Sequence, residues 1–153
     1  MAAFLYRYAG FPEFSPPEAS PFRDVPTTYQ FYTEITWLES TGITTGWYLG
    51  GGVREFRPQE PIGRDAMAAF LYRFNGAPDY SEPYSSPFAD VAPWAPFYYE
   101  ITWLNATEIT TGWDVGAGLK EFRPTATITR DAMAAFLSRH HTYEWTSANS
   151  GWR

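Results

Sequence analysis

Residues 65–74 have the sequence DAMAAFLYRF, and residues 131–140 repeat it as DAMAAFLSRH, 66 positions later (131 − 65 = 66). A third version, MAAFLYRYAG, opens the chain at residues 1–10. Each version places apolar side chains at i, i+3, i+4 and i+7, which is the spacing of an amphipathic helix. The alanines between them allow close packing. We therefore predict three equivalent helices, at 1–10, 65–75 and 131–141.

The repetition extends well beyond this helix. Aligning residues 22–76 with residues 88–142 at the same offset gives 32 identities in 55 positions, so both copies meet the same structural demands. A period of this length indicates a supersecondary unit. The duplication also favours a binding or assembly module over an enzyme, because a catalytic set usually occurs once per domain.

The composition excludes several classes of function. The net charge is −6 and the single lysine is Lys120, so no basic patch is available for nucleic acid. The absence of cysteine excludes disulfides, thiolate metal sites and cysteine nucleophiles. No apolar run approaches the roughly 20 residues of a membrane helix, and no signal peptide is present in this sequence. Because residues 1–10 match residues 67–76, at the end of a repeat, we interpret the chain as an excerpt of a longer protein or as a truncated frame.

Each of the two complete repeats is predicted to begin with another helix, the first helix of the repeat. These first helices lie near Phe31–Ser40 and Phe97–Ala106, where apolar residues recur at i, i+4 and i+7. Gly42 suits the left-handed position that ends such a helix. Its counterpart is Glu108, which would cost about 1 kcal/mol in the same conformation.

An ordered arm joins the two helices of each unit. It reads Gly-Ile-Thr-Thr-Gly-Trp, then a glycine-rich turn, then Glu-Phe-Arg-Pro. The β-branched residues 43–45 and 109–111 favour an extended backbone. Proline-rich runs at 11–21 and 77–87 are predicted to be extended connectors.

The predicted organisation has six segments. They are the last helix of a truncated first repeat (1–10), a connector (11–21), a repeat (22–76), a connector (77–87), a repeat (88–141) and an aromatic tail (142–153). The tail has no period, but we expect its aromatic residues Tyr143, Trp145 and Trp152 to dock on another part of the molecule.

Several sequence anchors occur in a fixed order. They are Phe-x-Asp-Val (22–25, 88–91), Gly-Ile-x-x-Gly (42–46), Phe-x-Pro (56–58, 122–124) and Ile-Thr-Arg (128–130) at a helix start. With this pattern the chain resembles S-layer homology repeats over nearly its whole length to His140. The strings Glu-Ile-Thr-Trp-Leu and Arg-Asp-Ala-Met-Ala-Ala-Phe-Leu are similar to a variant found in secreted wall-active enzymes of Gram-positive, actinobacterial type.

The resemblance implies an all-α fold of helix–loop–helix repeats with long ordered loops, forming a partial pseudo-threefold bundle. A complete bundle needs one more first helix, and we expect the tail, a second copy or a missing upstream segment to fill that position. Such domains hold exported proteins on the cell wall by binding secondary polysaccharides, often with an anionic pyruvate ketal. The implied location is extracellular, at the cell wall or cell surface.

The resemblance also implies where the ligand binds. In the family the Thr-Arg of an Ile-Thr-Arg-Ala-Glu motif lies at the ligand groove, which points to Thr129, Arg130 and Arg64, with Gly63 replacing one threonine. The motif's glutamate is absent here, because Asp-Ala follows each arginine.

Physical chemistry supports the two arginines independently. An arginine in the first turn of a helix adds a bidentate donor fork where free backbone N–H groups already favour anions. Trp47 and Trp113, next to Gly46 and Gly112, offer flat faces of the kind on which sugars stack. Burial of both tryptophans in the core is an equally good interpretation.

The acidic residues near the first helix favour structural roles. Asp24 and Asp90 are expected to cap backbone turns. Glu34 and Glu100 have no partner carboxylate in a different environment, which glycoside hydrolysis would need. We therefore predict no catalytic residues.

Other charged groups also have structural interpretations. His140 and His141 point about 100° apart on a helix and cannot easily share a metal, so no metal site is predicted. We expect His140 to pack loosely at a helix end. Arg57 and Arg123 either bind ligand or pair with acidic neighbours. Arg139 lies near a predicted helix C-terminus, where a cation is favourable.

We predict a non-catalytic cell-envelope attachment module that binds anionic secondary cell-wall polysaccharide and needs no cofactor. The alternative is a structural or assembly module that self-associates, or docks on a fused or partner enzyme, without binding glycan. Hydrolase activity is a third hypothesis, against which the missing nucleophile and metal patterns argue.

Overall fold

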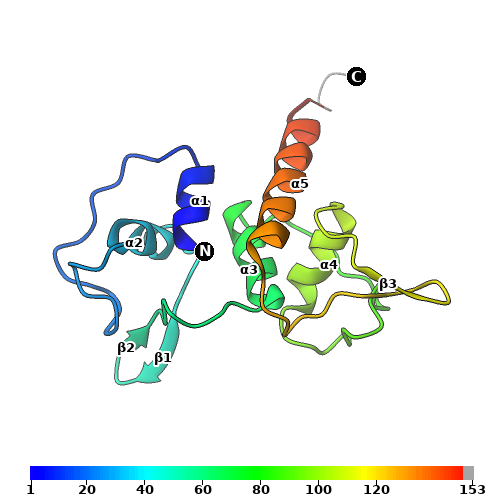
Figure 1. Cartoon of the computed structure of the whole chain (residues 1–153), viewed down its shortest axis with the longest axis horizontal. Helices are drawn as coiled ribbons and strands as arrows, with labels where there is room; N and C mark the ends of the chain where they lie inside the picture. The colour runs from blue at the N-terminus through cyan, green and yellow to red at the C-terminus, as the bar shows by residue number, and fades with distance from the viewer. Residues whose placement is uncertain (150–153) are drawn as a thin grey trace. The chain divides into compact units, whose positions relative to one another are not determined.

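The computed structural model describes the chain from Met1 to Asn149, with side chains described to Glu144. The backbone forms two compact units, Met1–Glu60 and Pro61 onward (Figure 1). The first unit contains α1 (Ala2–Tyr8), α2 (Tyr32–Ser40), β1 (Trp47–Gly50) and β2 (Val53–Glu55). The second contains α3 (Arg64–Phe74), α4 (Tyr98–Ala106), β3 (Trp113–Gly116), β4 (Leu119–Glu121) and α5 (Arg130–Asn149).

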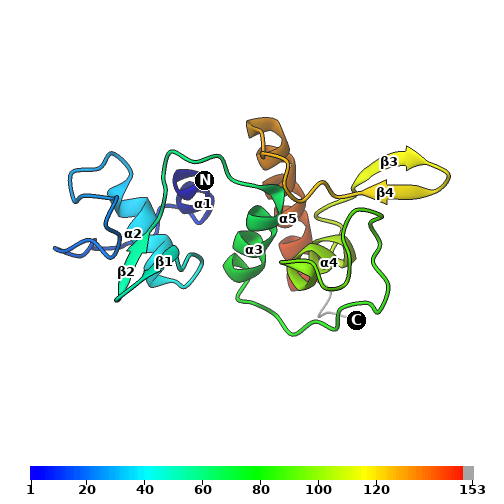
Figure 2. The same ribbon diagram turned by 90° about the horizontal axis from the view of Figure 1, so that it is seen from below.

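The predicted all-α fold is wrong, because each unit carries an antiparallel β-hairpin. Trp47 pairs with Glu55 in the first hairpin, and Trp113 pairs with Glu121 in the second. The turn of the first hairpin has positive φ at three successive glycines, 50–52, a conformation that lets the chain reverse tightly. The strands begin at Trp47 and Trp113, after the Ile-Thr-Thr residues for which the sequence predicted an extended backbone. Figure 2 shows β3 and β4 projecting from the helices of the second unit.

Each pair of packed helices combines helices from two successive sequence repeats. Helix α1 packs on α2, and α3 packs on α4. In each pair the second helix of one repeat packs on the first helix of the next. The repeat at 22–76 therefore crosses the boundary between the two folded units, which follows Glu60.

Equivalent residues form the core of each unit. The fully buried aliphatic side chains lie on the predicted helical stripes and just after α2 and α4; they include Leu5, Ile35, Leu38, Met67, Leu71, Ile101, Leu104 and Ile109. An edge-to-face aromatic pair accompanies each helix pair, Tyr6 with Trp37 at 5.3 Å and Tyr72 with Trp103 at 5.4 Å between ring centroids. The amphipathic pattern therefore located only part of the buried face, because Phe4, on the predicted stripe, is 41% exposed.

Tyrosine hydroxyls fasten the proline-rich segments to the helices. Tyr6 donates a hydrogen bond to the carbonyl of Pro12, and Tyr32 donates one to Pro17, each 2.8 Å long. The second unit repeats both bonds at equivalent residues, Tyr72 to Pro78 and Tyr98 to Pro83. These segments lack regular structure but are held against the units to which they belong.

Helix α5 runs to Asn149 and passes the predicted end at residue 141. Arg139 is therefore inside the helix, and its predicted place near a C-terminus is wrong. His140 is fully buried, against the expectation of loose packing, with its ring edge-to-face with Phe74. Tyr143 contacts Trp103 edge-on at 6.0 Å, so the start of the predicted tail does pack on α4. The side chain of Trp145 and the whole of Trp152 lie outside the described residues.

Candidate functional site: the arginine–tryptophan clusters

An aspartate ahead of each first helix holds the end of each hairpin in place. The two carboxylate oxygens of Asp24 accept hydrogen bonds from the backbone N–H groups of Phe56 and Arg57, at 2.9 and 2.7 Å. Asp90 does the same for Phe122 and Arg123, at 2.8 and 2.7 Å. The aspartates are structural, as predicted, but they join segments that are distant in the sequence.

Gly46 and Gly112 let the hairpins approach the core. Both have positive φ, and a Cβ added at Gly46 would lie 2.5 Å from the ring of Phe22 and 2.7 Å from the carbonyl oxygen of Glu55. At Gly112 the corresponding ring, that of Phe88, would lie at 2.7 Å. These glycines place the tryptophan that follows each of them, so their position has a structural explanation.

The two tryptophans lie on the hairpins and not in the core. Trp47 is 59% exposed and Trp113 is 38% exposed, which removes the interpretation that both are buried. The guanidinium of Arg57 lies 4.7 Å from the ring centroid of Trp47, and that of Arg123 lies 4.9 Å from Trp113. Both distances are within the range of a cation–π interaction.

The same two arginines also pair with acidic neighbours on the hairpins. Arg57 Nε lies 3.4 Å from a carboxylate oxygen of Glu55, and Arg123 Nε lies 3.1 Å from Glu121. Pairing with these neighbours was one of the two roles that the sequence left open. Each hairpin therefore presents an exposed tryptophan with an ion-paired arginine on its face.

The second unit adds Arg64 to this arrangement. Its side chain is only 5% exposed, and its guanidinium lies 4.0 Å from the ring centroid of Trp113. Phe122 and Phe136 flank the same group, each at 4.9 Å. Nε donates a 2.8 Å hydrogen bond to the carbonyl oxygen of Phe122. Arg64 is thus enclosed by three aromatic rings from the hairpin, the segment after it and α5.

Backbone pairing fixes Arg64 in this position. The N–H of Arg64 donates to the carbonyl of Ala126 at 3.0 Å, and Gly63 forms an isolated antiparallel bridge with Thr127. The start of α3 is therefore tied to the segment that follows the hairpin. Gly63, at the N-cap, has an extended backbone.

Burial disfavours the charged form of Arg64. It lowers the pKa of this guanidinium to about 10, and repulsion from Arg123 acts in the same direction, while the attraction of Asp90 opposes it. The group is still protonated at neutral pH. Among the described residues no carboxylate forms an ion pair with it, and Nε is its only nitrogen with a hydrogen-bond partner. Neither Nη atom is a fully buried polar atom without a partner, so both reach the surface and can donate to an anion there.

The structure does not bring the second predicted arginine to a tryptophan. Arg130 begins α5 and is exposed, and no contact with the ring of Trp113 occurs in the described part of the second unit. Thr129 is also exposed, and its hydroxyl donates to the carboxylate of Asp131, a bond that lowers the pKa of Asp131. Arg64 and Arg130 are thus equivalent in sequence but not in environment.

Sequence reasoning missed the two phenylalanines around Arg64. Phe122 is fully buried and Phe136 is 3% exposed. Phe136 belongs to the repeated helical stripe, and Phe122 to the repeated Phe-Arg-Pro, so both were visible as apolar positions. Nothing in a linear pattern indicated that they would meet the arginine of the preceding repeat.

A comparison with protein families matches the model of the S-layer homology domain to residues 21–68 and 87–134. The chain belongs to the S-layer homology family. Domains of this family are non-catalytic modules that attach proteins to the cell surface. A search of curated proteins found no match.

None of the helices in the described part of the chain is long and apolar enough to cross a membrane. The same residues contain no group of three metal-binding side chains of the histidine, cysteine, aspartate or glutamate type.

Proposed function

We propose that this chain attaches a secreted protein to the wall of a Gram-positive bacterium by binding an anionic secondary wall polysaccharide. The environment of Arg64 carries the proposal. A buried cation normally has an ion-pair partner, because removing a charge from water is costly. Arg64 has none among the described residues, and its Nη atoms are unpaired there. A carboxylate on a sugar, such as that of a pyruvate ketal, would supply the missing counter-charge in a bidentate geometry.

The exposed tryptophans supply the second half of the proposed site. A sugar ring presents a face of C–H groups that packs on an indole, while its polar groups stay in contact with water. Trp113 would bind the sugar that carries the charge, next to Arg64. Trp47, which is more exposed, would bind a sugar in the same way.

Arg130 and Thr129 are proposed as another anionic contact. Arg130 lies in the first turn of α5, where the dipole of a helix of this length favours an anion. Because the group is exposed, its contribution would be weaker and more sensitive to salt than that of Arg64.

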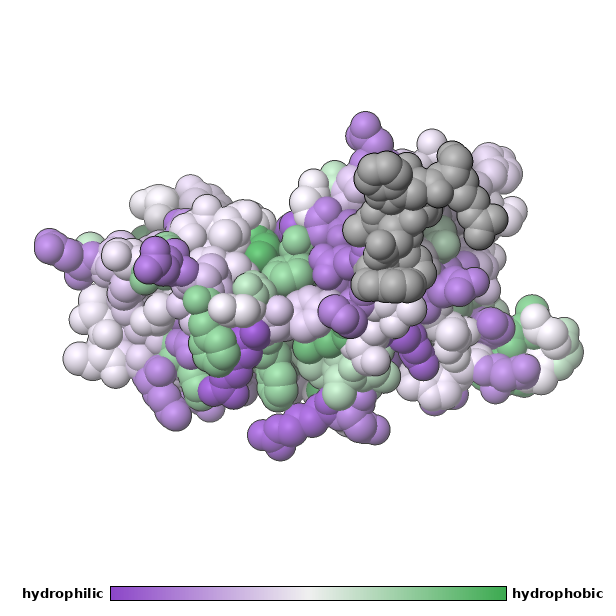
Figure 3. All heavy atoms as spheres, turned by 90° about the horizontal axis from the view of Figure 1, so that it is seen from above, coloured by the Kyte–Doolittle hydropathy of each residue, from purple (hydrophilic) through white to green (hydrophobic). Residues whose placement is uncertain are grey.

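One observation favours the alternative function of self-association or docking on a fused enzyme. Both hairpins expose apolar side chains besides their tryptophans: Tyr48, Leu49 and Val53 on the first, and Val115 and Leu119 on the second. The hairpin of the second unit forms the apolar projection at the right of Figure 3. Protein interfaces commonly use exposed apolar side chains of this kind.

Purified wall sacculi, before and after chemical removal of the secondary polymer, distinguish the two functions. We expect the chain to sediment with intact sacculi and to remain in solution with stripped sacculi. Replacing Arg64 and Arg130 together by alanine should abolish sedimentation. Arg23→Ala is the matched control, because Arg23 is an exposed arginine whose side chain pairs with Glu55.

Sedimentation that persists in the Arg64→Ala, Arg130→Ala variant would contradict the proposal. Binding to stripped sacculi would also contradict it. Concentration-dependent association of the free chain, measured by light scattering, would support the alternative. Circular dichroism of each variant separates loss of binding from loss of fold.

A further inference from the structure

In the described part of the chain, each β-hairpin has one edge that bonds to further backbone and one edge that does not. On β2 the carbonyl oxygen of Arg54 accepts a 2.9 Å hydrogen bond from the N–H of Arg23. On β4 the carbonyl oxygen of Lys120 accepts one from Ala89 in the same way, at 2.8 Å. No third strand pairs with β1 or β3 among the described residues. The open edges are therefore those of β1 and β3.

The strand register shows which backbone groups of β1 point to its open edge. In an antiparallel ladder the N–H and C=O of one residue lie on the same side of the strand, and opposite residues alternate between bonded and non-bonded pairs. The carbonyl of Arg54 points outward, to Arg23, and Tyr48 lies opposite Arg54. The N–H and C=O of Tyr48 consequently point away from β2. A strand added to β1 would hydrogen-bond to these two groups.

The open edge of β1 carries no charge. The strand reads Trp-Tyr-Leu-Gly, and its three large side chains are 59%, 70% and 44% exposed. The charged residues of β2 are paired within the same unit, Arg54 with Glu39 at 2.7 Å and Glu55 with Arg57 at 3.4 Å. Proteins commonly protect an open edge with a charged side chain, and an exposed apolar edge without one is a pairing site for another strand.

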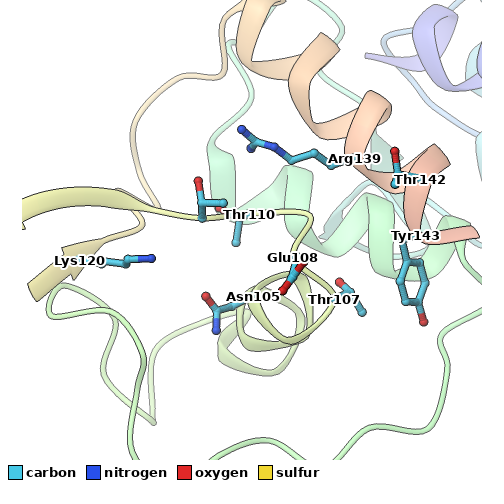
Figure 4. A pocket seen from close by; sticks show the side chains of 9 residues that line it. Asn105, Thr107, Glu108, Thr110, Lys120, Arg139, Thr142 and Tyr143 are labelled. Carbon is cyan, nitrogen blue, oxygen red and sulfur yellow. The ribbon is translucent and has the colours of Figure 1, made fainter. Parts of the chain in front are cut away.

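The second hairpin has charges at the equivalent positions. Asp114 replaces Tyr48 (48 + 66 = 114), and its carboxylate accepts a 2.8 Å hydrogen bond from the N–H of Gly116. Lys120 replaces Arg54, and Figure 4 shows it extending from this hairpin beside the end of α4. Two β3 strands placed edge to edge would bring Asp114 opposite Asp114, and like charges at that position repel. The edge of β3 is thus protected, whereas that of β1 is not.

We infer that β1 of one molecule pairs antiparallel with β1 of a second copy of this chain. The pair has a twofold axis at Tyr48, where the N–H of each Tyr48 donates to the carbonyl oxygen of the other. Trp47 of each copy then lies opposite Leu49 of the other, as an aromatic–aliphatic cross-strand pair. The two hairpins become one sheet with the strand order β2–β1–β1–β2.

Self-complementarity identifies the second copy as the occupant. An antiparallel pair is symmetrical, so a strand that is open and uncharged in one molecule meets an identical partner in another. Because only one of the two hairpins is unprotected, the association closes at a dimer and does not continue into a filament. The contact uses no residue of the Arg64 cluster. It therefore accompanies wall binding without replacing it, and it does not depend on the proposed function.

The contact is small, with four residues from each molecule, so the dimer is weak. Copies attached to one surface have a high effective concentration, which favours such a contact. Each molecule also carries a net charge of −6, so the copies repel one another at long range. Added salt screens this repulsion and should strengthen the dimer.

Sedimentation velocity of the whole chain, from about 10 μM to about 1 mM, tests the inference. We expect a monomer–dimer equilibrium with a Kd of roughly 0.1–1 mM, and a larger dimer fraction at higher salt. In the ¹⁵N-labelled chain the amide resonance of Tyr48 should shift with concentration, and its exchange with D₂O should slow as the dimer forms.

Tyr48→Asp gives the first hairpin the edge residue of the second. The fold should be kept, because Asp114 occupies this position in a folded hairpin of the same chain, and circular dichroism checks it. We expect dimerisation at least about tenfold weaker, with unchanged sedimentation with intact sacculi. Tyr84→Asp is the matched control, because Tyr84 is 98% exposed on a connector of the second unit, and this variant should dimerise like wild type.

A chain that stays monomeric at about 1 mM would overturn the inference. Equal dimerisation of wild type and Tyr48→Asp would also overturn it, as would an equal loss in Tyr84→Asp. Slow exchange of the Tyr48 amide at every concentration would identify an occupant within the chain and contradict the second copy. Dimerisation that persists in the Arg64→Ala, Arg130→Ala variant would support the inference, whether or not that variant binds sacculi.

Discussion

The two hairpins have equivalent strand pairing but present their tryptophans differently. Trp47 has one arginine on its face, Arg57, and is 59% exposed. Trp113 has two, Arg123 from its own hairpin and Arg64 from the start of α3, and is 38% exposed. The complete cluster therefore combines residues of two successive repeats. No single repeat contains the whole cluster, because Arg64 belongs to the repeat at 22–76 and Trp113 to the repeat at 88–141.

The largest effect is expected from Gly112→Ala. The new Cβ would lie 2.7 Å from the ring of Phe88 and 3.0 Å from the carbonyl oxygen of Glu121, at a residue with positive φ. We expect the free energy of unfolding in urea to fall by about 2–4 kcal/mol. Gly118→Ala is the control, because its φ is positive but its Cβ meets no atom within 4 Å, and it should cost only about 1 kcal/mol. Equal losses would show that the close contact is unimportant.

The aspartates test the parts of the two units that are alike. Asp24→Asn and Asp90→Asn each replace an acceptor of two backbone hydrogen bonds by a group with one acceptor oxygen. Each should lower the free energy of unfolding by about 1–3 kcal/mol, because a backbone N–H then loses its partner. The losses should be similar in both units. A loss confined to one unit would contradict the equivalence of the two hairpin anchors.

Glu108 and Gly42 test a position at which the units differ. Glu108→Gly should raise the free energy of unfolding by about 1 kcal/mol, because glycine adopts the left-handed conformation without strain. Gly42→Ala should lower it by a similar amount. Thermal unfolding of the two variants measures both changes, and a destabilising Glu108→Gly would mean that the carboxylate stabilises the free chain.

The smallest effect concerns His140, which occupies the position of Phe74 in the preceding helix. Burial lowers the pKa of His140, while Glu144 opposes the shift and His141 reinforces it. The unfolded chain therefore binds more protons below its ordinary pKa of about 6.5, and stability should decrease as the pH falls from that value toward the folded pKa. His140→Phe should remove this decrease. An unchanged dependence of the melting temperature between pH 7 and 5 would exclude His140 as its source.

The helices could be predicted from sequence because each depends on local periodicity. Predicted bounds at Phe31–Ser40 and Phe97–Ala106 agree with α2 and α4 to within one residue. The hairpins were missed because a strand of three or four residues has too few positions to show alternation. Their register depends on contacts made elsewhere, such as that of Asp24 with the hairpin end.

The candidate site was predictable only in part. Arg64 and Trp113 could be selected from motifs, since a repeated arginine at a helix start and a repeated tryptophan after glycine are local features. Their contact could not be predicted, because it depends on α3 pairing with the segment after the second hairpin. The contrast between buried Arg64 and exposed Arg130 follows from the same long-range pairing.

Calorimetric titration of the polysaccharide released from the wall into wild-type, Arg64→Met and Arg57→Met chains tests most directly whether the complete cluster is the anion site. Methionine keeps an apolar stem at both positions, and thermal unfolding confirms that each variant is folded. The Arg64→Met variant should bind at least about tenfold more weakly, whereas Arg57→Met should stay within about twofold of wild type, because Arg57 is already paired with Glu55. Equal affinities for wild type and Arg64→Met would contradict the account.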